Sequence, residues 1–277
     1  MKINPAIFRE YDIRGLAETE LTSEVIRKIG QSYGTLLRAK GVDKALIGGD
    51  VRLSTPVIRA NLIAGLISLG IDVIDIGTVT TPMFYFGLYH LDLHGGIMIT
   101  GSHNPKEYNG LKIAFGKTTL YGNDIQSIRQ IIEQDKIVKG DRKGRVFKND
   151  IANAYFEMLA AKIQLGPRKL KVVADAGNGA AGPYLEKFLQ RMGCDVIPLF
   201  CEPDGSFPNH HPDPVKREYL TYLIEEVRKH RADVGIAYDG DADRIGVVDD
   251  QGEIIWGDIL MVLYWREILA KHPRLPL

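Results

Sequence analysis

The pentapeptide GIDVI at residues 70–74 recurs as GCDVI at residues 193–197, and this repeat decides the fold that we expect for the chain. Each copy follows apolar residues at helical spacing. Each of those helical segments in turn follows an apolar stretch of strand length, ALIGGD at 45–50 and LKVVAD at 170–175. The order strand, helix, strand therefore occurs twice, which predicts two related α/β units.

Segments on either side of the two repeats continue the alternation of strands and helices. A further strand is expected at Gly95–Thr100, and residues 233–250 (DVGIAYDGDADRIGVVDD) indicate strand, acidic turn and strand. Helical spacing of apolar residues is found at 25–37, 55–70, 123–132, 184–192, 219–227 and 259–269. The predicted fold class is α/β, with two related domains whose mixed, mostly parallel sheets are layered by helices.

The polar, basic stretch 135–150 has little helical pattern, and we interpret it as the link between domains. The expected units are therefore residues 1–150 and 151–254. Residues 255–277 contain a helix with no following strand to pack beside, so they are expected to open a third domain that is absent. The sequence is accordingly predicted to be a fragment of a longer protein.

The composition excludes several classes of protein. Of 277 residues, 45% are hydrophobic and 25% are charged, and Lys+Arg equals Asp+Glu at 35 each. This balance gives no net field that would attract nucleic acid or an anionic membrane. Charged residues interrupt the first 15 positions, so no signal peptide is indicated. Cys194 and Cys201 lack CxxC spacing, and no apolar stretch has membrane-spanning length, so we expect a cytoplasmic protein.

The hexapeptide DGDADR places Asp239, Asp241 and Asp243 at alternate positions between two predicted strands. Three adjacent carboxylates repel one another unless a cation neutralises them. Gly240 and Ala242 are expected to allow the tight bend that brings the carboxylates together. Oxygen ligands of this kind suit Mg²⁺ or Ca²⁺. The alternative is a solvated acidic turn without metal.

An EF-hand does not explain this acidic turn. Its loop needs Gly at the sixth position and Glu at the twelfth, where this chain has Arg244 and Asp250.

A second motif, GNGAAG at Gly177–Gly182, has the G-x-G-x-x-G pattern of a dinucleotide-binding turn. It supports an NAD-dependent dehydrogenase, with Glu202 as the acidic residue after the next strand. Asp175 weakens that hypothesis because its carboxylate would lie near the pyrophosphate. The proline-rich segment 202–214 also replaces a second βαβ unit. The other interpretation is that these glycines let a helix pack tightly on a strand.

The third motif, MITGSHNPKEYNG at 98–110, carries Ser102 just after a predicted strand. Gly101 is expected to free the backbone to turn and to leave the Ser102 hydroxyl unshielded. No G-x-S-x-G elbow is present, so an acyl-enzyme hydrolase is disfavoured. By itself Ser102 would be a turn residue. Together with three carboxylates it fits phosphoryl transfer, in which metal ions and positioned cations carry most of the catalysis.

At this point the sequence resembles the α-D-phosphohexomutases, and within them the bacterial phosphomannomutase/phosphoglucomutase group. FREYDIRG at 8–15 resembles the family's N-terminal motif, TGSHNPKEYNGLK at 100–112 its phosphoserine loop, and DGDADR at 239–244 its metal loop. The segment DGSFPNHHPDP at 204–214 is similar to a further family segment. The resemblance implies the first two of four domains, without the later sugar-recognition and phosphate-binding loops.

The resemblance also implies an activity and a set of site residues. Phosphorylated Ser102 would interconvert hexose 1-phosphate and hexose 6-phosphate (mannose, glucose or both) through a hexose 1,6-bisphosphate. Mg²⁺ would be held by Asp239, Asp241, Asp243 and the phosphate on Ser102. The residues implied to line the site are Arg14, His103, Lys112 and Arg244, with Tyr11 in the cleft wall. Lys112 could move a proton if its pKa is lowered.

The residues leave some points open. A dehydrogenase built on Gly177–Gly182 and a non-catalytic, metal-stabilised module that binds sugar phosphate remain alternatives. The oligomeric state is not indicated. As a fragment without the later loops, the chain is expected to have low activity alone, because loss of remote binding contacts lowers turnover.

Overall fold

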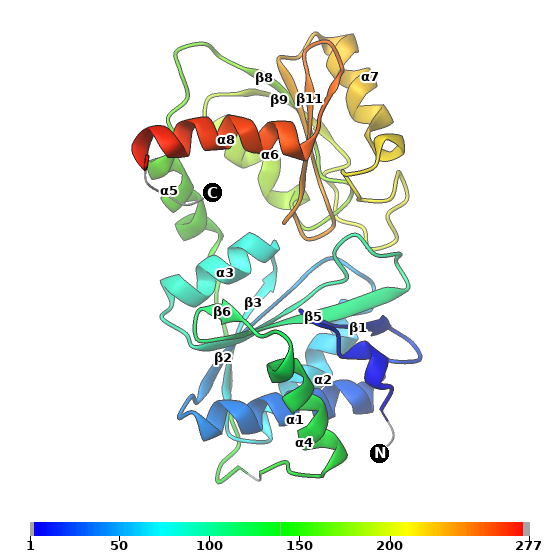
Figure 1. The fold of residues 1–277 in the computed structure, drawn as a ribbon, viewed down its shortest axis with the longest axis vertical. Coiled ribbons are helices and arrows are strands. Elements are labelled where there is room, and N and C mark those ends of the chain that lie inside the picture. Colours follow the sequence, from blue (N-terminus) through cyan, green and yellow to red (C-terminus); the bar gives the residue numbers. More distant parts are fainter. Residues whose placement is uncertain (1–2, 139, 274–277) are drawn as a thin grey trace.

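The computed structural model describes residues 3–138 and 140–273, which form two α/β units stacked along the long axis (Figure 1). The first unit contains a mixed sheet with the strand order β1-β5-β4-β2-β3-β7, and the two-residue β6 pairs with β5. The strands are β1 (Ile13–Leu16), β2 (Lys44–Gly49), β3 (Asp72–Thr78), β4 (Gly95–Ile99), β5 (Tyr108–Phe115), β6 (Thr118–Thr119) and β7 (Val146–Lys148).

Helices cover both faces of this first sheet. Helices α1 (Ser23–Ala39), α2 (Thr55–Ile67) and α4 (Asn123–Glu133) contribute to one apolar core, which includes Ile29, Leu62 and Ile128. Helix α3 (Thr81–His90) contributes Phe84 and Leu88 to the core on the other face. Because α3 lies on the face toward the second unit, its N-terminus reaches the junction between the two sheets (Figure 1).

The second unit repeats this arrangement on a smaller scale. Its sheet has the order β12-β11-β10-β8-β9, with α7 packed on one face and α6 on the other. The elements are α5 (Ala152–Lys162), β8 (Lys171–Asp175), α6 (Gly182–Arg191), β9 (Asp195–Leu199), α7 (Thr221–His230), β10 (Val234–Tyr238), β11 (Ile245–Asp249) and β12 (Ile254–Ile255). Short 3-10 turns lie at Pro5–Ile7 and Arg217–Leu220.

The repeat noticed in the sequence is a repeat of structure. In the first unit β2, α2 and β3 form a parallel strand–helix–strand unit, and β8, α6 and β9 do the same in the second. In both, the glycine after the helix has a left-handed backbone, with φ of 83° at Gly70 and 89° at Gly193. This conformation costs glycine no Cβ clash, so it ends the helix and starts the next strand.

In each mixed sheet one strand is reversed: β5 and β11 run antiparallel to their neighbours, while the other strands of each sheet share one direction. The expectation of mixed, mostly parallel sheets is confirmed. Both reversed strands return directly from a loop rather than through a crossover helix. These two connections are too short for a crossover, so β5 and β11 pair with the preceding strands as hairpins.

The interpretation of residues 135–150 as a link is wrong for residues 140–148, which belong to the first unit. The backbone N–H of Gly144 donates to Ile67 O at 2.8 Å, and β7 pairs in parallel with β3. Arg142 binds Asp72 at 2.8 Å, and this hydrogen bond lowers the pKa of Asp72 to about 2. Three-residue β7 is exposed and too short for a recognisable pattern, so the sequence does not reveal it.

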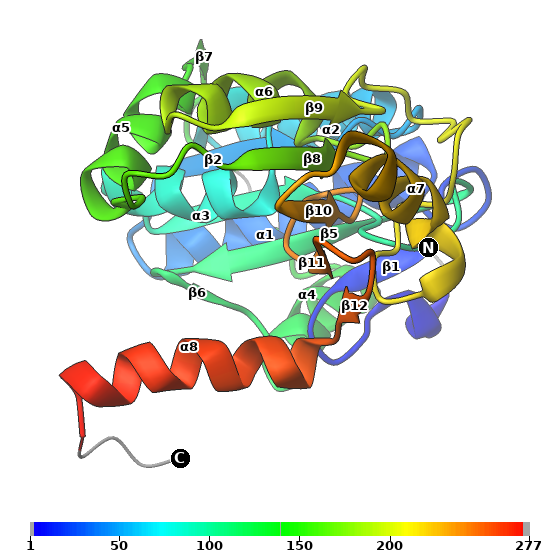
Figure 2. The same cartoon turned by 90° about the horizontal axis from the view of Figure 1, so that it is seen from above.

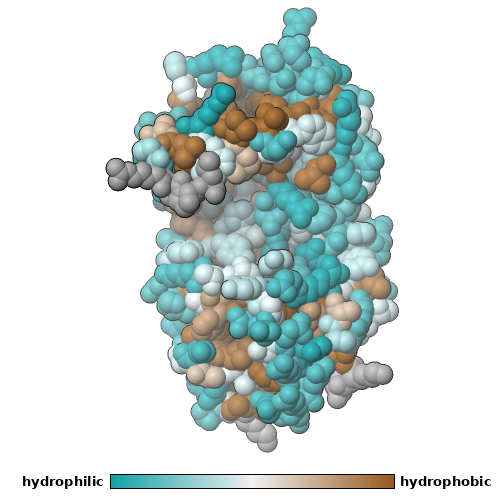
Figure 3. All heavy atoms as spheres, in the orientation of Figure 1, coloured by the Kyte–Doolittle hydropathy of each residue, from teal (hydrophilic) through white to brown (hydrophobic). Residues whose placement is uncertain are grey.

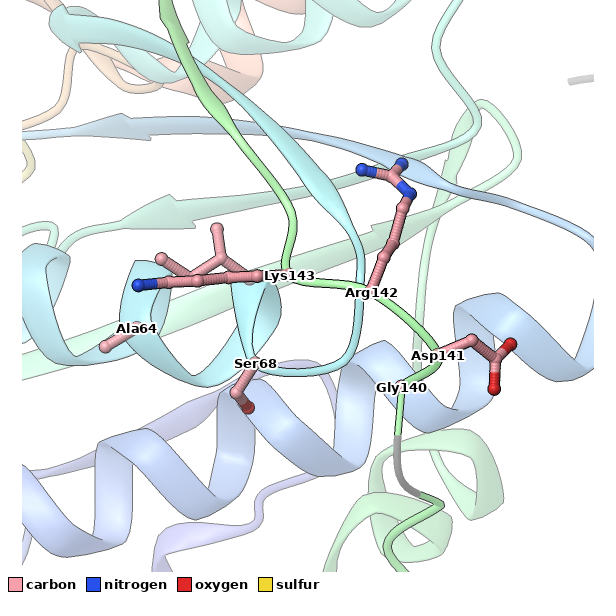
Figure 4. A pocket seen from close by; sticks show the side chains of 7 residues that line it. Ala64, Ser68, Gly140, Asp141, Arg142 and Lys143 are labelled. Atoms are coloured by element: carbon pink, nitrogen blue, oxygen red, sulfur yellow. The ribbon is translucent and has the colours of Figure 1, made fainter.

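Figure 4 shows the segment 140–143 beside Ala64 of α2 and Ser68, which follows α2, where these residues line a cavity of about 540 Å³. All of the residues that line this cavity belong to the first unit, and none of them is part of the Ser102 loop or of the acidic turn at 239–244.

The predicted C-terminal helix is α8 (Gly257–Lys271), which extends away from both sheets (Figure 2). Its large apolar side chains are exposed, and Figure 3 shows brown apolar atoms over this element. They are Ile259, Met261, Val262, Leu263, Tyr264 and Ile268. The last part of the predicted 255–277 segment, 274–277, lies outside the described residues. Among the helices that the structure describes, none is long and apolar enough to cross a membrane.

Candidate active site

The serine loop of the first unit (residues 101–108) and the acidic turn of the second unit (residues 239–244) meet at the junction between the sheets. Ser102 follows the C-terminal end of β4, and Asp239 follows β10. The Ser102 hydroxyl donates a hydrogen bond to Asp239 Oδ2 at 2.8 Å, although 137 positions separate the two residues. The structure therefore brings together the two motifs that the sequence suggests for phosphoryl transfer.

Ser102 has a constrained backbone and a buried side chain. Its φ is 50°, a left-handed conformation that a non-glycine residue adopts at a cost, and only 3% of the residue is exposed. Its N–H donates to Thr100 Oγ1 at 2.8 Å. The expectation that Gly101 turns the backbone and leaves Ser102 unshielded is therefore wrong. Ser102 itself makes the turn, and a Cβ on Gly101 would lie 2.4 Å from Arg52 Nε.

The acidic turn is organised by Asp239. Its Oδ1 accepts the backbone N–H of Asp243 at 3.1 Å, which closes the turn over four residues. Ala242, with φ of 56°, is the left-handed residue of the turn, whereas Gly240 allows close packing because a Cβ there would lie 2.8 Å from Ser102 O. Of the two residues expected to permit the bend, Ala242 alone is left-handed and Gly240 makes room for the serine loop.

The three aspartates offer oxygen atoms that lie within 4.8 Å of one another. Burial, followed by the charges of Asp241 and Asp243, raises the pKa of Asp239. Asp241 is fully buried; burial opposes its charge, but Lys112 Nζ at 2.8 Å and the Thr81 hydroxyl at 2.6 Å outweigh burial and lower its pKa. Its Oδ1 has no hydrogen-bond partner among the described residues.

Lys112 lies on β5 and forms ion pairs with Asp241 and Asp243. Burial of the ammonium group lowers its pKa, but the charges of the two carboxylates outweigh burial and leave the pKa raised. The expectation of a lysine that moves protons through a lowered pKa is therefore not met in this arrangement. Lys112 is here a fixed cation that balances part of the acidic cluster.

His103 lies beside the serine, with its Nδ1 3.1 Å from Ser102 Oγ. Burial, and next the positive charge of Arg244, lower the pKa of His103. The His103 carbonyl accepts a hydrogen bond from Nε2 of His211 in the second unit. Loop 202–214 of the second unit therefore holds the serine loop from the other side of the junction.

The remaining predicted residues lie at different depths around this junction. Arg14 on β1 is buried, binds Asp12 at 2.6 Å and donates to Gly101 O at 3.4 Å. Arg244 is half-buried at the start of β11. Tyr11 is 70% exposed, and its hydroxyl makes no hydrogen bond to the described part of the chain. Arg14 thus contacts the serine loop, and the charge of Arg244 acts on His103 in that loop. The place of Tyr11 in the cleft wall stays a prediction.

Two family models and a set of relatives match the chain. Residues 5–138 match the model described as "Phosphoglucomutase/phosphomannomutase, alpha/beta/alpha domain I", and residues 153–252 match domain II of the same family. The chain belongs to the phosphoglucomutase/phosphomannomutase family. Within this family it is 43% identical over 268 residues to a phosphomannomutase/phosphoglucomutase of Pseudomonas putida, with 97% of this chain and 57% of the relative covered.

Other members of the phosphoglucomutase/phosphomannomutase family are similar to the same extent. A phosphoglucomutase of Neisseria gonorrhoeae is 42% identical, with 96% of this chain and 58% of the relative covered. The crystal structure of a family protein from Burkholderia thailandensis has a TM-score of 0.93 and 39% identity, with 98% of this chain and 60% of that chain covered. The chain thus spans somewhat more than half the length of these relatives.

The GNGAAG loop of this phosphoglucomutase/phosphomannomutase family chain packs against protein rather than presenting its amides to a ligand. The N–H of Gly177 donates to Asp175 Oδ1 at 2.8 Å, and those of residues 178–180 donate to backbone oxygens. A Cβ on Gly182 would lie 2.1 Å from Cys201 O. The glycines therefore serve helix packing, and family membership overturns the dehydrogenase hypothesis.

Sequence reasoning missed several residues of the family site. Thr81 binds Asp241 through both its hydroxyl and its N–H, from the first turn of α3. The pattern Thr-Thr-Pro at 80–82 marks a helix start and could have indicated this position. Buried Asp50 accepts from the N–H of Gly101 at 3.1 Å, and buried Arg52 donates to four carbonyls of the serine loop. No local pattern marks those two.

The three aspartates of this phosphohexomutase chain fit a divalent cation. The unpartnered Oδ1 of Asp241 is a buried oxygen with spare coordination capacity, and the neighbouring carboxylates supply further oxygens. The ammonium group of Lys112 pairs with two of the three carboxylates, those of Asp241 and Asp243, and carries only one positive charge, so the cluster retains negative charge. Hard oxygen donors with excess negative charge are the ligand set that Mg²⁺ and Ca²⁺ prefer.

Proposed function

We propose that the chain forms the serine- and metal-bearing part of a phosphohexomutase that interconverts hexose 1-phosphate and hexose 6-phosphate. The observation that carries the proposal is the hydrogen bond at 2.8 Å between the Ser102 hydroxyl and Asp239, across the junction of the two units. A buried hydroxyl beside an acidic, cation-binding cluster is suited to accept and return a phosphoryl group. The names of the relatives support the same reaction class.

In the proposed reaction Ser102 carries the phosphoryl group. The bond between Oγ and phosphorus breaks, a bond forms between phosphorus and a hydroxyl oxygen of the hexose phosphate, and that hydroxyl's proton ends on Oγ. The product is a hexose 1,6-bisphosphate. After the bisphosphate turns in the site, its other phosphorus bonds to Oγ, the bond to the sugar oxygen breaks, and the proton returns to the sugar.

The proposed cofactor is Mg²⁺, held by Asp239, Asp241 and Asp243. When bound, the cation stabilises negative charge on the transferring phosphoryl group. Arg14 and Arg244 offer planar, permanently charged groups for phosphate oxygens. Lys112 neutralises Asp241 and Asp243, and His103 packs beside the serine hydroxyl.

The proposed substrates are phosphates of mannose, glucose or both, because the names of the relatives include both sugars. We also propose residues 1–150 and 151–254 as the two units. Helix α8 is then the first element of a further unit, because its apolar side chains are exposed rather than packed on either sheet.

The proposal is tested by measuring phosphate on Ser102. The protein is incubated with glucose 1,6-bisphosphate and Mg²⁺, and its intact mass and phosphopeptides are determined. We expect one phosphate on Ser102 in the unmodified chain and in Ser127→Ala, a control at a half-buried position of α4, and none in Ser102→Ala. Binding of glucose 1-phosphate without phosphate on Ser102 would support the non-catalytic binding module instead. Phosphate on another residue would contradict the proposal.

A further inference from the structure

Arg52, in the loop between β2 and α2, has a fully buried side chain. Burial of a charged group is unfavourable unless hydrogen bonds and an opposite charge replace water. Asp50 supplies the opposite charge, with its Oδ2 3.3 Å from Arg52 Nε. Because Arg52 is buried while its neighbour Leu53 is 72% exposed, the guanidinium group is directed into the molecule rather than left at its surface.

The hydrogen bonds that the guanidinium group of Arg52 makes to described residues all go to one segment, the serine loop at residues 101–108. Nη2 donates to the carbonyls of Ser102 at 2.7 Å and Asn104 at 2.6 Å. Nη1 donates to the carbonyls of Pro105 at 2.7 Å and Tyr108 at 2.9 Å. The loop is therefore wound around a single guanidinium group, with four of its carbonyl oxygens converging on that group.

These contacts bear directly on the strained serine. The left-handed φ of Ser102 persists only if its surroundings hold it. Its carbonyl is held by Arg52 and its N–H by Thr100, while its hydroxyl reaches Asp239. With both backbone polar groups fixed, the backbone sets the direction of the Cα–Cβ bond of Ser102, from which the hydroxyl reaches Asp239.

The second unit covers the same arginine. The ring of Phe207 lies with its centroid 5.4 Å from the guanidinium carbon of Arg52, a cation–π contact. A Cβ on Gly205 would lie 2.4 Å from Val51 O, so the backbone of this second-unit loop rests on the loop that carries Arg52. Arg52 therefore links the serine loop to the unit that carries the acidic turn.

We propose that Arg52 is a positioning residue for phosphoryl transfer: its guanidinium group holds the serine loop so that the Ser102 hydroxyl faces Asp239 across the junction. This inference rests on the proposed function of Ser102. Arg52 acts through the loop backbone and does not itself contact the transferring group. Lysine cannot replace Arg52. The two terminal nitrogens of the planar guanidinium group each bind two carbonyl oxygens, and a single ammonium group cannot reach all four.

The test compares Arg52→Lys with Arg59→Lys. Arg59 is a matched control because it is also mostly buried, pairs with Asp75 and donates to a carbonyl, Gly77 O at 2.8 Å, but does not contact the serine loop. The single-turnover rate of phosphate transfer from glucose 1,6-bisphosphate to Ser102 is measured against bisphosphate concentration, with Mg²⁺ present. Thermal unfolding reports on the fold of both variants.

We expect Arg52→Lys to lower the maximal transfer rate by about 100-fold, with the half-saturating concentration changed little, because the reacting oxygen is displaced. Arg59→Lys should lose thermal stability without this selective loss of rate. A transfer rate in Arg52→Lys equal to that in Arg59→Lys would overturn the proposal. If Arg52→Lys does not fold, Phe207→Leu is used, and the proposal then requires a lower maximal rate in that variant.

A second readout separates this inference from the proposed function. Hydrogen exchange of the amides of residues 101–108 is compared in the two lysine variants. Faster exchange confined to this loop in Arg52→Lys supports the positioning role of Arg52. Absence of phosphate from the unmodified chain would contradict the proposed function of Ser102, but it would leave this support for the role of Arg52 in place. Unchanged exchange in the loop would overturn the role of Arg52.

Discussion

Replacement of Gly101 by alanine is expected to disturb the serine loop more than any other single methyl group added there. The added Cβ would lie 2.4 Å from Nε, 2.5 Å from Cζ and 2.9 Å from Nη1 of Arg52. The guanidinium group has no free space to enter, since it is fully buried and its hydrogen bonds fix it on two sides. Either the loop or the arginine must therefore move.

The size of the movement sets the expected cost. Nonbonded heavy atoms reach favourable contact at roughly 3.5 Å, so the clash requires a displacement of about 1 Å. Such a shift would stretch the hydrogen bonds from Arg52 to Ser102 O and Asn104 O, now 2.7 and 2.6 Å, beyond hydrogen-bond range. The loss of two hydrogen bonds to a charged group, each worth about 1.5–3 kcal/mol, predicts a loss of about 3–6 kcal/mol in the free energy of unfolding.

Thermal unfolding measures this loss. For units of this size, 1 kcal/mol corresponds to about 2–4 °C, so Gly101→Ala should lower the Tm of the first unit by about 10 °C. Gly166→Ala is the control, because a Cβ at Gly166 meets no atom within 4 Å. If Gly101→Ala lowers stability by no more than Gly166→Ala, the loop tolerates the displacement and the reasoning about the arginine is refuted.

Three further predictions concern the acidic turn, the second unit and the glycine loop. Mg²⁺ at about 100 times its Kd should raise the free energy of unfolding by about 2.7 kcal/mol, and calorimetry with and without EDTA should show this gain in the unmodified chain but not in Asp241→Asn. His210 Nε2 lies 2.9 Å from Asp175 Oδ2, and although burial lowers its pKa, this hydrogen bond and charge leave the pKa raised. The stabilisation from this pair is complete below the ordinary His pKa of 6.5 and is lost as pH rises through the raised pKa of His210. The difference in Tm between the unmodified chain and His210→Gln should therefore shrink at alkaline pH. A difference in Tm that grows with pH would contradict this prediction. Gly182→Ala should destabilise the second unit, because its Cβ would lie 2.1 Å from Cys201 O. NAD should leave the Tm of the unmodified chain unchanged. Stabilisation by NAD would count against a packing role for the glycine loop.

Much of the fold was accessible from the sequence, because helices and strands of the repeat have strong periodicity. The positions of α1, α2, β2 and β3, and of β8, α6 and β9 in the second unit, follow from apolar spacing and from glycine at helix ends. The exposed, three-residue β7 was not accessible, since its residues match no buried pattern.

The candidate site divides in a similar way. Ser102 and the three aspartates stand out in the sequence because their residue types and spacing match one chemistry. Arg52 and Thr81 do not stand out, because their roles come from contacts with segments distant in the chain. The pKa of Lys112 also depends on two carboxylates of the other unit, which leave it raised. The sequence alone could state only the condition, a lowered pKa, under which Lys112 would move a proton.

By itself, the amino-acid sequence determined the repeated α/β architecture, the acidic turn and the serine loop, because local periodicity and residue chemistry are properties of short segments. The tertiary structure decided that Ser102 faces Asp239, that its left-handed backbone is held by Arg52, and that the glycine loop packs rather than binds a nucleotide. Each of these depends on the distance between segments separated by tens of residues. The packing of the two units sets the first of these distances, and packing within each unit sets the other two.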